Sequence, residues 1–331
     1  MPAKVQTLSA LSNGFYIPPD DETVYDTIIA NVSDATPAYD LSTWQGLFKL
    51  GMSGHANLVL ELGGTIDGTY TSDEGKVYSY PWIIVDFRDV ETEDGIIYHN
   101  VPILQAQRVP HDSSGPWSGN MPFDPAEPGN PITTVASKGD QRWKYSFIRQ
   151  YMNGFGTDWW QPVNEYDVRS TYPTTGFMSR LNSELCQRIK PIKIYTPINP
   201  YFFTEIDDND SISYDCFWLA STNELNRDIG VSHMPKNGEP FQLYKQGGGS
   251  YKKYPFTKSS GEGVGYWLRN AYISSTWKTS FYYINFITST GAFNINYNTA
   301  GAPNYTGNTW GNDILPCFAL IGDTGDLSEP E

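Results

Sequence analysis

Apolar and polar residues alternate most regularly near the C-terminal end of the chain, within residues 265–321. In the segment 293–298, each apolar side chain is followed by an asparagine. Successive side chains of a strand point to opposite faces, so this segment predicts a strand that buries Phe293, Ile295 and Tyr297. Its three asparagines would face outward, although asparagine is a poor strand former. The residues of this outer face are therefore not explained by strand stability and suggest a binding surface. An ordinary polar hairpin with a solvated loop explains the same pattern.

The first half of the chain predicts one short helix followed by strands. Residues 42–50 would form the helix, with Ser42 as its N-cap residue and Trp44, Leu47 and Phe48 on one face. Strands are expected at residues 57–62, 76–87 and 96–104.

The second half predicts two more helices, at residues 143–153 and 177–189, where Pro191 stops the second. Residues 111–131 are rich in Pro, Gly and Ser and predict a long surface loop. Further strands are expected at residues 192–196, 215–221 and 281–287, the last joined to segment 293–298 by a hairpin turn. The pattern favours an α+β fold that is rich in strands, with two short helices in its middle and long loops.

Composition supports a ring-rich core and excludes some partners. The 331 residues include 10 Trp, 23 Tyr and 16 Phe, so aromatic packing carries much of the interior. A net charge of −15 argues against nucleic acid, whose phosphates need a basic face, and against anionic membrane surfaces. No apolar run predicts insertion into a membrane, and the first residues do not resemble a secretion signal. We therefore expect assembly in the cytoplasm.

The polarity changes along the chain predict three parts. Residues 1–40 are polar and contain Pro and an acidic cluster, which indicates an N-terminal arm for docking or oligomerisation. Residues 41–322 would form one domain, and residues 323–331 an acidic tail. Whether residues 41–135 form a separate module stays open.

The chemically reactive residues indicate a non-catalytic protein without a cofactor or a metal. Cys186, Cys216 and Cys317 are widely spaced beside apolar residues, as buried free thiols are. The four histidines lack the spacing of metal ligands. The acidic turn at residues 207–210 offers carboxylates for glycoside hydrolysis, but three acids in one polar turn favour a solvated loop. Trp159 and Trp160 would either stack on a sugar or pack beneath a loop, and the sequence supports both interpretations.

A series of anchors in this order resembles a bacterial and phage domain family with the C-type lectin fold, over roughly residues 41–321. The anchors are Trp44, Gly63, Trp143, Ser146, Arg149, Met152, Asn153, Gly176, Phe177, Phe217, Trp218, Leu219, Ala220, Ser221, Glu224, Trp267, Leu268, Arg269, Asn270, Gly291, Pro316, Phe318, Ala319 and Leu320. The resemblance implies a C-type lectin-like domain.

Residues 265–321 are also similar to the variable region of proteins diversified by retroelements, such as phage tropism determinants. That similarity implies a homotrimeric receptor-binding protein on a virion tail or capsid fibre, in contact with other virion proteins and with a bacterial surface protein or glycan. The implied ligand-binding residues are Asn270, Tyr272, Trp277, Tyr282, Tyr283, Asn285, Asn294, Asn296, Tyr297, Asn298, Asn304, Tyr305, Asn308, Trp310 and Asn312. A structural virion protein, such as a head decoration, and a bacterial surface adhesin are the alternatives.

The sequence departs from two functional branches of this fold. Calcium-dependent lectins carry close Glu-Pro-Asn and Trp-Asn-Asp motifs, whereas here a glycine interrupts both 127–130 and 310–313, which lie far apart. Calcium needs several convergent oxygens, so a calcium site is not expected. Sulfatase-modifying enzymes use reactive cysteines late in the chain, whereas Cys317 lies within an apolar segment where a thiol is inert.

Overall fold

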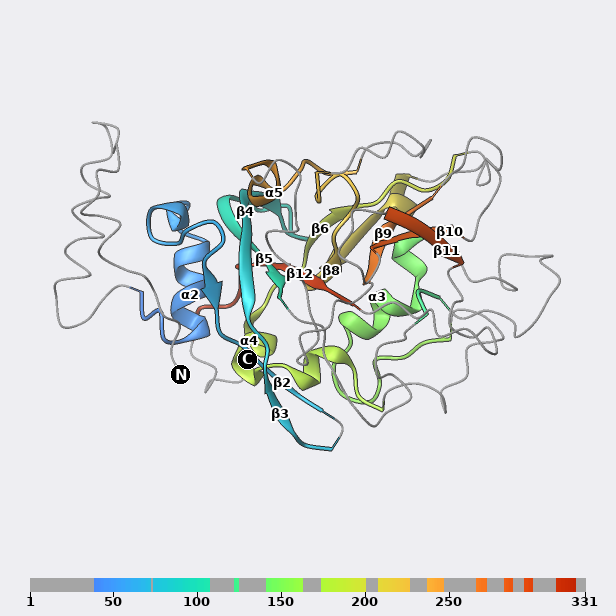
Figure 1. The fold of residues 1–331 in the computed structure, drawn as a ribbon. Helices are drawn as coiled ribbons and strands as arrows, with labels where there is room; N and C mark the ends of the chain where they lie inside the picture. The colour runs from blue at the N-terminus through green and yellow to red at the C-terminus, as the bar shows by residue number, and fades with distance from the viewer. Residues whose placement is uncertain are drawn as a thin grey trace.

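The structure is a computed structural model, and it describes residues 39–72, 74–107, 122–124, 141–162, 174–200, 208–226, 237–246, 266–272, 283–287, 295–299 and 314–325. Within these ranges the chain has a mixed α+β fold whose strands pair antiparallel (Figure 1). The predicted α+β class and its richness in strands are therefore confirmed. No helix among the described residues is long and apolar enough to cross a membrane.

A five-stranded sheet forms the centre of the fold, in the order β1-β4-β5-β12-β8. These strands are β1 (Thr65–Ile66), β4 (Trp82–Glu91), β5 (Ile97–Ala106), β8 (Trp218–Leu219) and β12 (Pro316–Ala319). β4 and β5 form a long hairpin, and β12 lies between β5 and β8. The last described strand therefore joins two parts of the chain that are far apart in sequence.

Three smaller sheets complete the strand arrangement. They are β2 (Thr69–Thr71) with β3 (Val77–Ser79), β6 (Ile192–Tyr195) with β7 (Ile212–Asp215), and the row β11 (Ile295–Thr299), β10 (Tyr283–Ile287) and β9 (Tyr266–Ala271). In Figure 1, β9, β10 and β11 lie at the end of the molecule opposite α2. The predicted pairing of segments 281–287 and 293–298 is confirmed, since β10 pairs antiparallel with β11 along its whole length. The predicted turn at residues 288–291 lies outside the described residues.

The helices are short. They are α2 (Trp44–Gly51), α3 (Phe147–Met152), α4 (Ser183–Arg188) and α5 (Gln242–Gln246), with 3-10 turns at Ala56–Leu58, Trp143–Tyr145, Phe177–Arg180 and Asp208–Ser211.

Helix α2 confirms its predicted apolar face and corrects its predicted cap. Trp44, Leu47 and Phe48 are each at most 5% exposed. The Gly46 amide donates to the Thr43 hydroxyl oxygen at 3.1 Å, so Thr43 is the N-cap residue. The prediction of Ser42 is wrong by one residue because Asp40 accepts the Ser42 hydroxyl proton.

Each of the two helices predicted in the middle of the chain is divided in two. Ser146 ends a 3-10 turn and begins α3, since its hydroxyl oxygen accepts from the Arg149 amide. The 3-10 turn before α4 ends at Leu181, and Asn182 begins α4, because its side-chain oxygen accepts from the Leu185 amide at 3.2 Å. An N-cap side chain satisfies an amide that has no partner inside the helix, so a helix restarts where one occurs.

Three predicted strands differ from the structure. Residues 57–62 form a turn instead, because the amides of Val59 and Leu60 donate to Ala56. The predicted strand 76–87 is split into β3 and β4, with Pro81, which has no N–H to donate, between them. Segment 215–221 is likewise interrupted, between β7 and β8. The strands at 96–104 and 192–196 are confirmed within two residues.

Aromatic rings fill the core, as the composition indicates. Trp82 meets Phe318 at a ring-centroid distance of 4.8 Å with nearly perpendicular planes, and both are fully buried. Trp159 is 7% exposed and packs edge-on against Phe147 and Tyr151. Of the two interpretations of Trp159, packing in the core is therefore the one that the structure supports.

The predicted surface loop at 111–131 contains a buried segment. Residues 122–124 are all buried, and Phe123 packs against Trp143 and Trp267. The Asp124 carboxylate accepts from the Phe147 amide at 3.1 Å, so this segment is fixed to the start of α3. The rest of the loop lies outside the described residues, as do residues 1–38 of the predicted arm.

Candidate functional site

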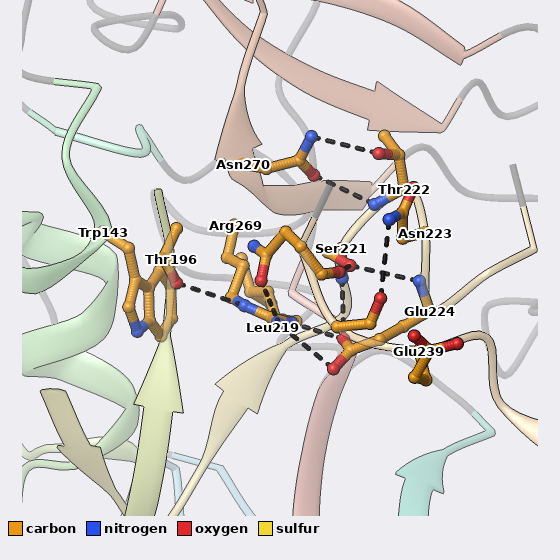
Figure 2. A network of polar contacts seen from close by, with 12 residues as sticks. Trp143, Thr196, Leu219, Ser221, Thr222, Asn223, Glu224, Glu239, Arg269 and Asn270 are labelled. Atoms are coloured by element: carbon orange, nitrogen blue, oxygen red, sulfur yellow. Dashed lines mark hydrogen bonds and ion pairs between the residues drawn. The ribbon is translucent and has the colours of Figure 1, made fainter. Parts of the chain in front are cut away.

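A buried ion pair joins β9 to the turn that follows β8. Arg269 and Glu224 are 2% and 3% exposed, respectively. Arg269 Nη2 donates to Glu224 Oε1 at 3.0 Å, and Nη1 donates to Oε2 (Figure 2). Two parallel bonds of this kind fix both the distance and the orientation of the partners.

Every N–H of the Arg269 guanidinium has an acceptor. Besides the bonds to Glu224, Nε donates to Thr196 Oγ1 at 3.2 Å and Nη1 donates to the Leu219 carbonyl at 2.8 Å. Nη2 donates to Asn237 Oδ1 at 3.1 Å. Because a guanidinium has five N–H groups, none remains to bind a ligand, and Arg269 is a residue that positions β9.

The turn that carries Glu224 is built by its own sequence. In Ser221-Thr222-Asn223-Glu224, the Glu224 amide donates to the Ser221 hydroxyl oxygen at 3.1 Å. In return, the Ser221 amide donates to the Glu224 carboxylate at 2.9 Å. This is the reciprocal arrangement of a capping box, Ser-x-x-Glu. The turn therefore fixes the position of the Glu224 carboxylate through its own bonds, independently of Arg269.

A second segment, residues 237–241, closes over the same carboxylate. The Ser221 hydroxyl donates to the Asn237 carbonyl at 2.6 Å, and the Phe241 amide donates to the Glu224 carbonyl at 2.8 Å. Gly238 has a φ of +75°, and a Cβ atom there would lie 3.0 Å from the Glu224 carboxylate. Glycine is therefore required by both the backbone conformation and the space.

Arg88 of β4 connects this segment to the central sheet. Its Nη2 donates to the Glu239 carbonyl at 3.0 Å, and its Nη1 lies 3.6 Å from Glu224 Oε1. Its guanidinium also lies over the ring of Phe241, 4.8 Å from the centroid. We call Arg88, Ser221, Glu224, Asn237 and Arg269 the polar clamp. It holds β4, the turn after β8, residues 237–241 and β9 in one rigid arrangement.

A family model described as a domain of unknown function, DUF6273, matches residues 132–320, more than half of the chain. The chain belongs to the DUF6273 family. No curated protein and no solved structure matches it. The DUF6273 region contains four of the five clamp residues, whereas Arg88 and the strands β4 and β5 precede it.

Two predicted ligand-binding residues of the DUF6273 region have described side chains. Asn270 is 3% exposed, and its amide bonds the neighbouring turn: Oδ1 accepts from the Thr222 amide at 3.0 Å and Nδ2 donates to Thr222 Oγ1 at 3.2 Å (Figure 2). This side chain is therefore placed in the interior and not on an outward face. Tyr272 is partly exposed at the end of β9.

The other predicted contact residues are placed only in part. For Tyr283 and Asn285 in β10, and for Asn296, Tyr297 and Asn298 in β11, the structure describes the main chain alone. The expected alternation of buried rings and outward amides therefore stays a prediction. Outside the described residues lie Trp277, Tyr282, Asn294, Asn304, Tyr305, Asn308, Trp310 and Asn312.

The polar clamp is the feature that the sequence interpretation missed. Arg269 and Glu224 both belong to the anchors of the resemblance, but they are 45 residues apart and nothing in their spacing pairs them. Two local signals were present. The Ser-x-x-Glu pattern marks a capping box, and an arginine within the apolar run Tyr266-Trp267-Leu268 needs a buried partner.

The three thiols are buried or partly buried and free, as predicted. Burial raises the pKa of Cys317 well above that of an ordinary thiol, and the nearby Glu224 carboxylate raises it further. Burial, followed by the charge of Asp215, raises the pKa of Cys216 to about 12. The pKa of Cys186 is also raised by burial. Since the thiolate is the reactive form, these groups are poor nucleophiles at neutral pH.

The described residues contain no group of three or more His, Cys, Asp or Glu side chains arranged to hold a metal. His99 pairs instead with Asp89, with Nδ1 2.8 Å from the carboxylate, and both are largely exposed. The bond from His99 lowers the pKa of Asp89. In the acidic turn, the Tyr145 hydroxyl donates to Asp210, while Asp207 lies outside the described residues.

Proposed function

We propose that the chain is a non-catalytic binding protein of a phage particle, and that its β9–β11 sheet presents residues 272–312 to a bacterial surface protein or glycan. One observation carries the proposal. Every residue of β9 is buried, and β9 is fixed by the five bonds of Arg269, immediately before a stretch dominated by Tyr, Asn, Ser, Thr and Gly.

The composition of that stretch is the composition of a contact surface. Tyr and Trp supply large contact areas with few rotatable bonds, while Asn and Ser supply adaptable hydrogen bonds. Lys278 and Asp313 are the clear charges between residues 270 and 314. A surface of this kind recognises polar groups through shape and hydrogen bonds, and its partner need not carry a particular charge.

The rigid base bears on affinity. Side chains and loops that become ordered on binding lose conformational entropy, and this loss weakens the affinity. A platform that is already fixed before binding makes the loss smaller. The polar clamp and the ring contacts of Trp267 fix the strand from which the contact surface extends. Many copies on one particle, in our proposal as homotrimers, would raise a modest affinity per site through effective concentration.

We also propose that the α+β fold is of the C-type lectin-like kind. The order of helix, hairpin, divided helices and closing strand supports this proposal, because β12 returns at the end of the domain to pair with β5. Trp267 and Arg269 lie in β9, near the C-terminal end of the domain, and fix the β9–β11 sheet there. This position also supports the C-type lectin-like proposal.

Sequencing the region that encodes residues 265–321 in a natural population tests the proposal. We expect substitutions at the Asn, Tyr, Ser and Thr codons, with Trp267, Arg269 and Phe318 unchanged. An invariant region would contradict diversification and favour a fixed role in virion assembly.

A binding experiment tests the contact surface itself. The full chain with Tyr305 and Trp310 both changed to Ala should adsorb at least about tenfold more weakly to bacterial cells from the same sample, because aromatic anchors dominate such interfaces. Tyr195→Ala is the matched control, since Tyr195 is 52% exposed on β6, outside the stretch. Equal adsorption of all three proteins would exclude this surface.

A further inference from the structure

A groove of about 780 Å³ lies between the start of α2, the start of α4 and the β2–β3 hairpin. In Figure 1, α2 and the hairpin lie away from β9–β11. The lining of the groove includes the buried apolar side chains of Trp44, Leu47 and Ile66. At its edge, Val77 is 62% exposed, the most exposed large apolar residue of the described part of the chain. A groove with an apolar floor and an exposed apolar rim is suited to binding a peptide.

Strand β3, which lines this groove, offers main-chain groups for pairing. Tyr70 lies opposite Tyr78, and the flanking ladder bonds run from Tyr80 to Gly68 and from Ser72 to Lys76. In an antiparallel ladder only alternate residues face the partner strand, so the N–H and C=O groups of Val77 and Ser79 point away from β2. Among the described strands, β3 pairs with β2 alone. An extended segment can therefore add to its outer edge.

The chain itself supplies a segment at this place. The described part begins at Tyr39, and the next residues, Leu41, Ser42 and Thr43, line the groove. Thirty-eight residues precede Tyr39. Their longest uninterrupted apolar run is Phe15-Tyr16-Ile17-Pro18-Pro19, about twenty residues before Tyr39, whereas the shorter run Ile28-Ile29-Ala30 lies between Asp26 and Asp34. Residues 15–19 are thus connected to the groove by a linker of moderate length.

Charge selects the same part of the segment. The charged residues among those that line the groove are Asp67 and Glu184, both acidic. Residues 1–19 contain Lys4 and no Asp or Glu, whereas residues 20–38 contain five acidic residues and no Lys or Arg. Glu184 is already paired with Arg188 and accepts from the amides of Trp44 and Gln45. The Asp67 carboxylate disfavours the acidic second part, whereas residues 11–19 carry no charge and meet no such repulsion. The acidic part is therefore the linker, and the apolar part is the ligand.

We propose that residues 11–19 of the same chain bind in this groove, extended along β3, with the ring of Phe15 or Tyr16 on its apolar floor. A flexible linker of twenty residues has a root-mean-square span of roughly 25 Å, and such linkers give effective concentrations in the millimolar range. An intrinsic dissociation constant of about 0.1 mM is then enough to keep the groove occupied in most molecules. This inference does not depend on the proposed receptor-binding function.

Limited proteolysis of the full chain tests the proposal. Chymotrypsin cleaves after aromatic residues, so it reports on Phe15 and Tyr16, and cleavage after Tyr25 in the linker is the internal reference. We expect slow cleavage after Phe15 and Tyr16 in the unchanged chain and at least about fivefold faster cleavage in Val77→Asp. Ile97→Asp is the matched control, since Ile97 is 55% exposed on β5, away from the groove lining, and it should leave the rate unchanged.

A second variant keeps the test independent of the groove residue. Ile17→Asp should also accelerate cleavage after Phe15, without changing the rate at Tyr25. Equal rates at Phe15 in the unchanged chain, in Val77→Asp and in Ile17→Asp would overturn the proposal. Protection that disappears on tenfold dilution would also overturn it, because the segment would then come from a second copy of the chain.

Discussion

Phe318 of β12 lies directly opposite Leu104 of β5 in the central sheet, and both side chains are fully buried. Phe318 belongs to the DUF6273 region, whereas Leu104 lies before it. The same sheet continues from β5 to β4, which also precedes the region. The DUF6273 region and the strands before it therefore share one hydrophobic core.

This shared core predicts that the DUF6273 region does not fold alone. A fragment of residues 132–320 lacks β4 and β5 and leaves one edge of β12 without a partner, so we expect poor chemical-shift dispersion and no cooperative unfolding in urea. A fragment of residues 39–325 contains every described element and should unfold cooperatively. A cooperative transition in the shorter fragment would show that the sheet tolerates the loss of β1, β4 and β5, three of its five strands.

The polar clamp predicts a large loss of stability when one member of its ion pair is removed. Glu224→Gln should lower the free energy of unfolding by about 3–5 kcal/mol, because it leaves the Arg269 charge buried without its counter-charge. Urea denaturation measures the change. Lys193→Ala is the control, since Lys193 pairs with Glu91 at 3.0 Å where both side chains are more than a third exposed, and it should leave the free energy of unfolding nearly unchanged. Similar losses in both variants would contradict the importance of burial.

The cap of α2 gives a test between adjacent residues. Thr43→Ala removes the acceptor of the Gly46 amide and should lower the free energy of unfolding by about 1 kcal/mol. Ser42→Ala removes only an exposed bond to Asp40 and should change it by less than about 0.5 kcal/mol. Thermal denaturation of both variants measures the difference, and a greater loss in Ser42→Ala would assign the cap to Ser42.

The raised thiol pKa values predict how stability depends on alkaline pH. A free thiol titrates near pH 8.5, whereas the pKa of Cys216 is about 12 in the folded chain. Between these values the unfolded chain loses a proton that the folded chain keeps, so stability falls as pH rises, by about 1.4 kcal/mol per pH unit for each thiol. The stability of Cys216→Ala should decline less steeply from pH 9 to 10.5. Parallel slopes would contradict the shift.

The sequence was most informative where periodicity and chemistry agree. The second part of the predicted strand 76–87 and the apolar face of α2 follow from side-chain pattern alone, and both are observed: residues 82–86 of β4 are buried, as is that face of α2. The divided helices were missed because apolar spacing continues through Ser146 and Asn182, while the cap bonds that end and restart a helix depend on single polar atoms. Periodicity averages over a turn, so it does not detect such atoms.

The polar clamp was harder to predict for a different reason. The turn around Glu224 is local and has a recognisable pattern, but its partner Arg269 is brought to it by the packing of β8 against β9. Asn270 shows the same limit. Asparagine is a residue type that is common in contact surfaces, but the fold places this one against Thr222 in the interior. Residue type suggests what a side chain can do, and only the tertiary structure decides what it meets.

The position of β12 also bears on synthesis of the chain. β12 separates β5 from β8, and it is made about two hundred residues after β5. Until it emerges from the ribosome, β5 and β8 have no strand between them, and each has an unpaired edge available to other nascent chains. Contacts this distant in sequence also slow folding. We therefore expect the yield in a foreign host to follow the supply of chaperones more closely than the stability of the finished protein.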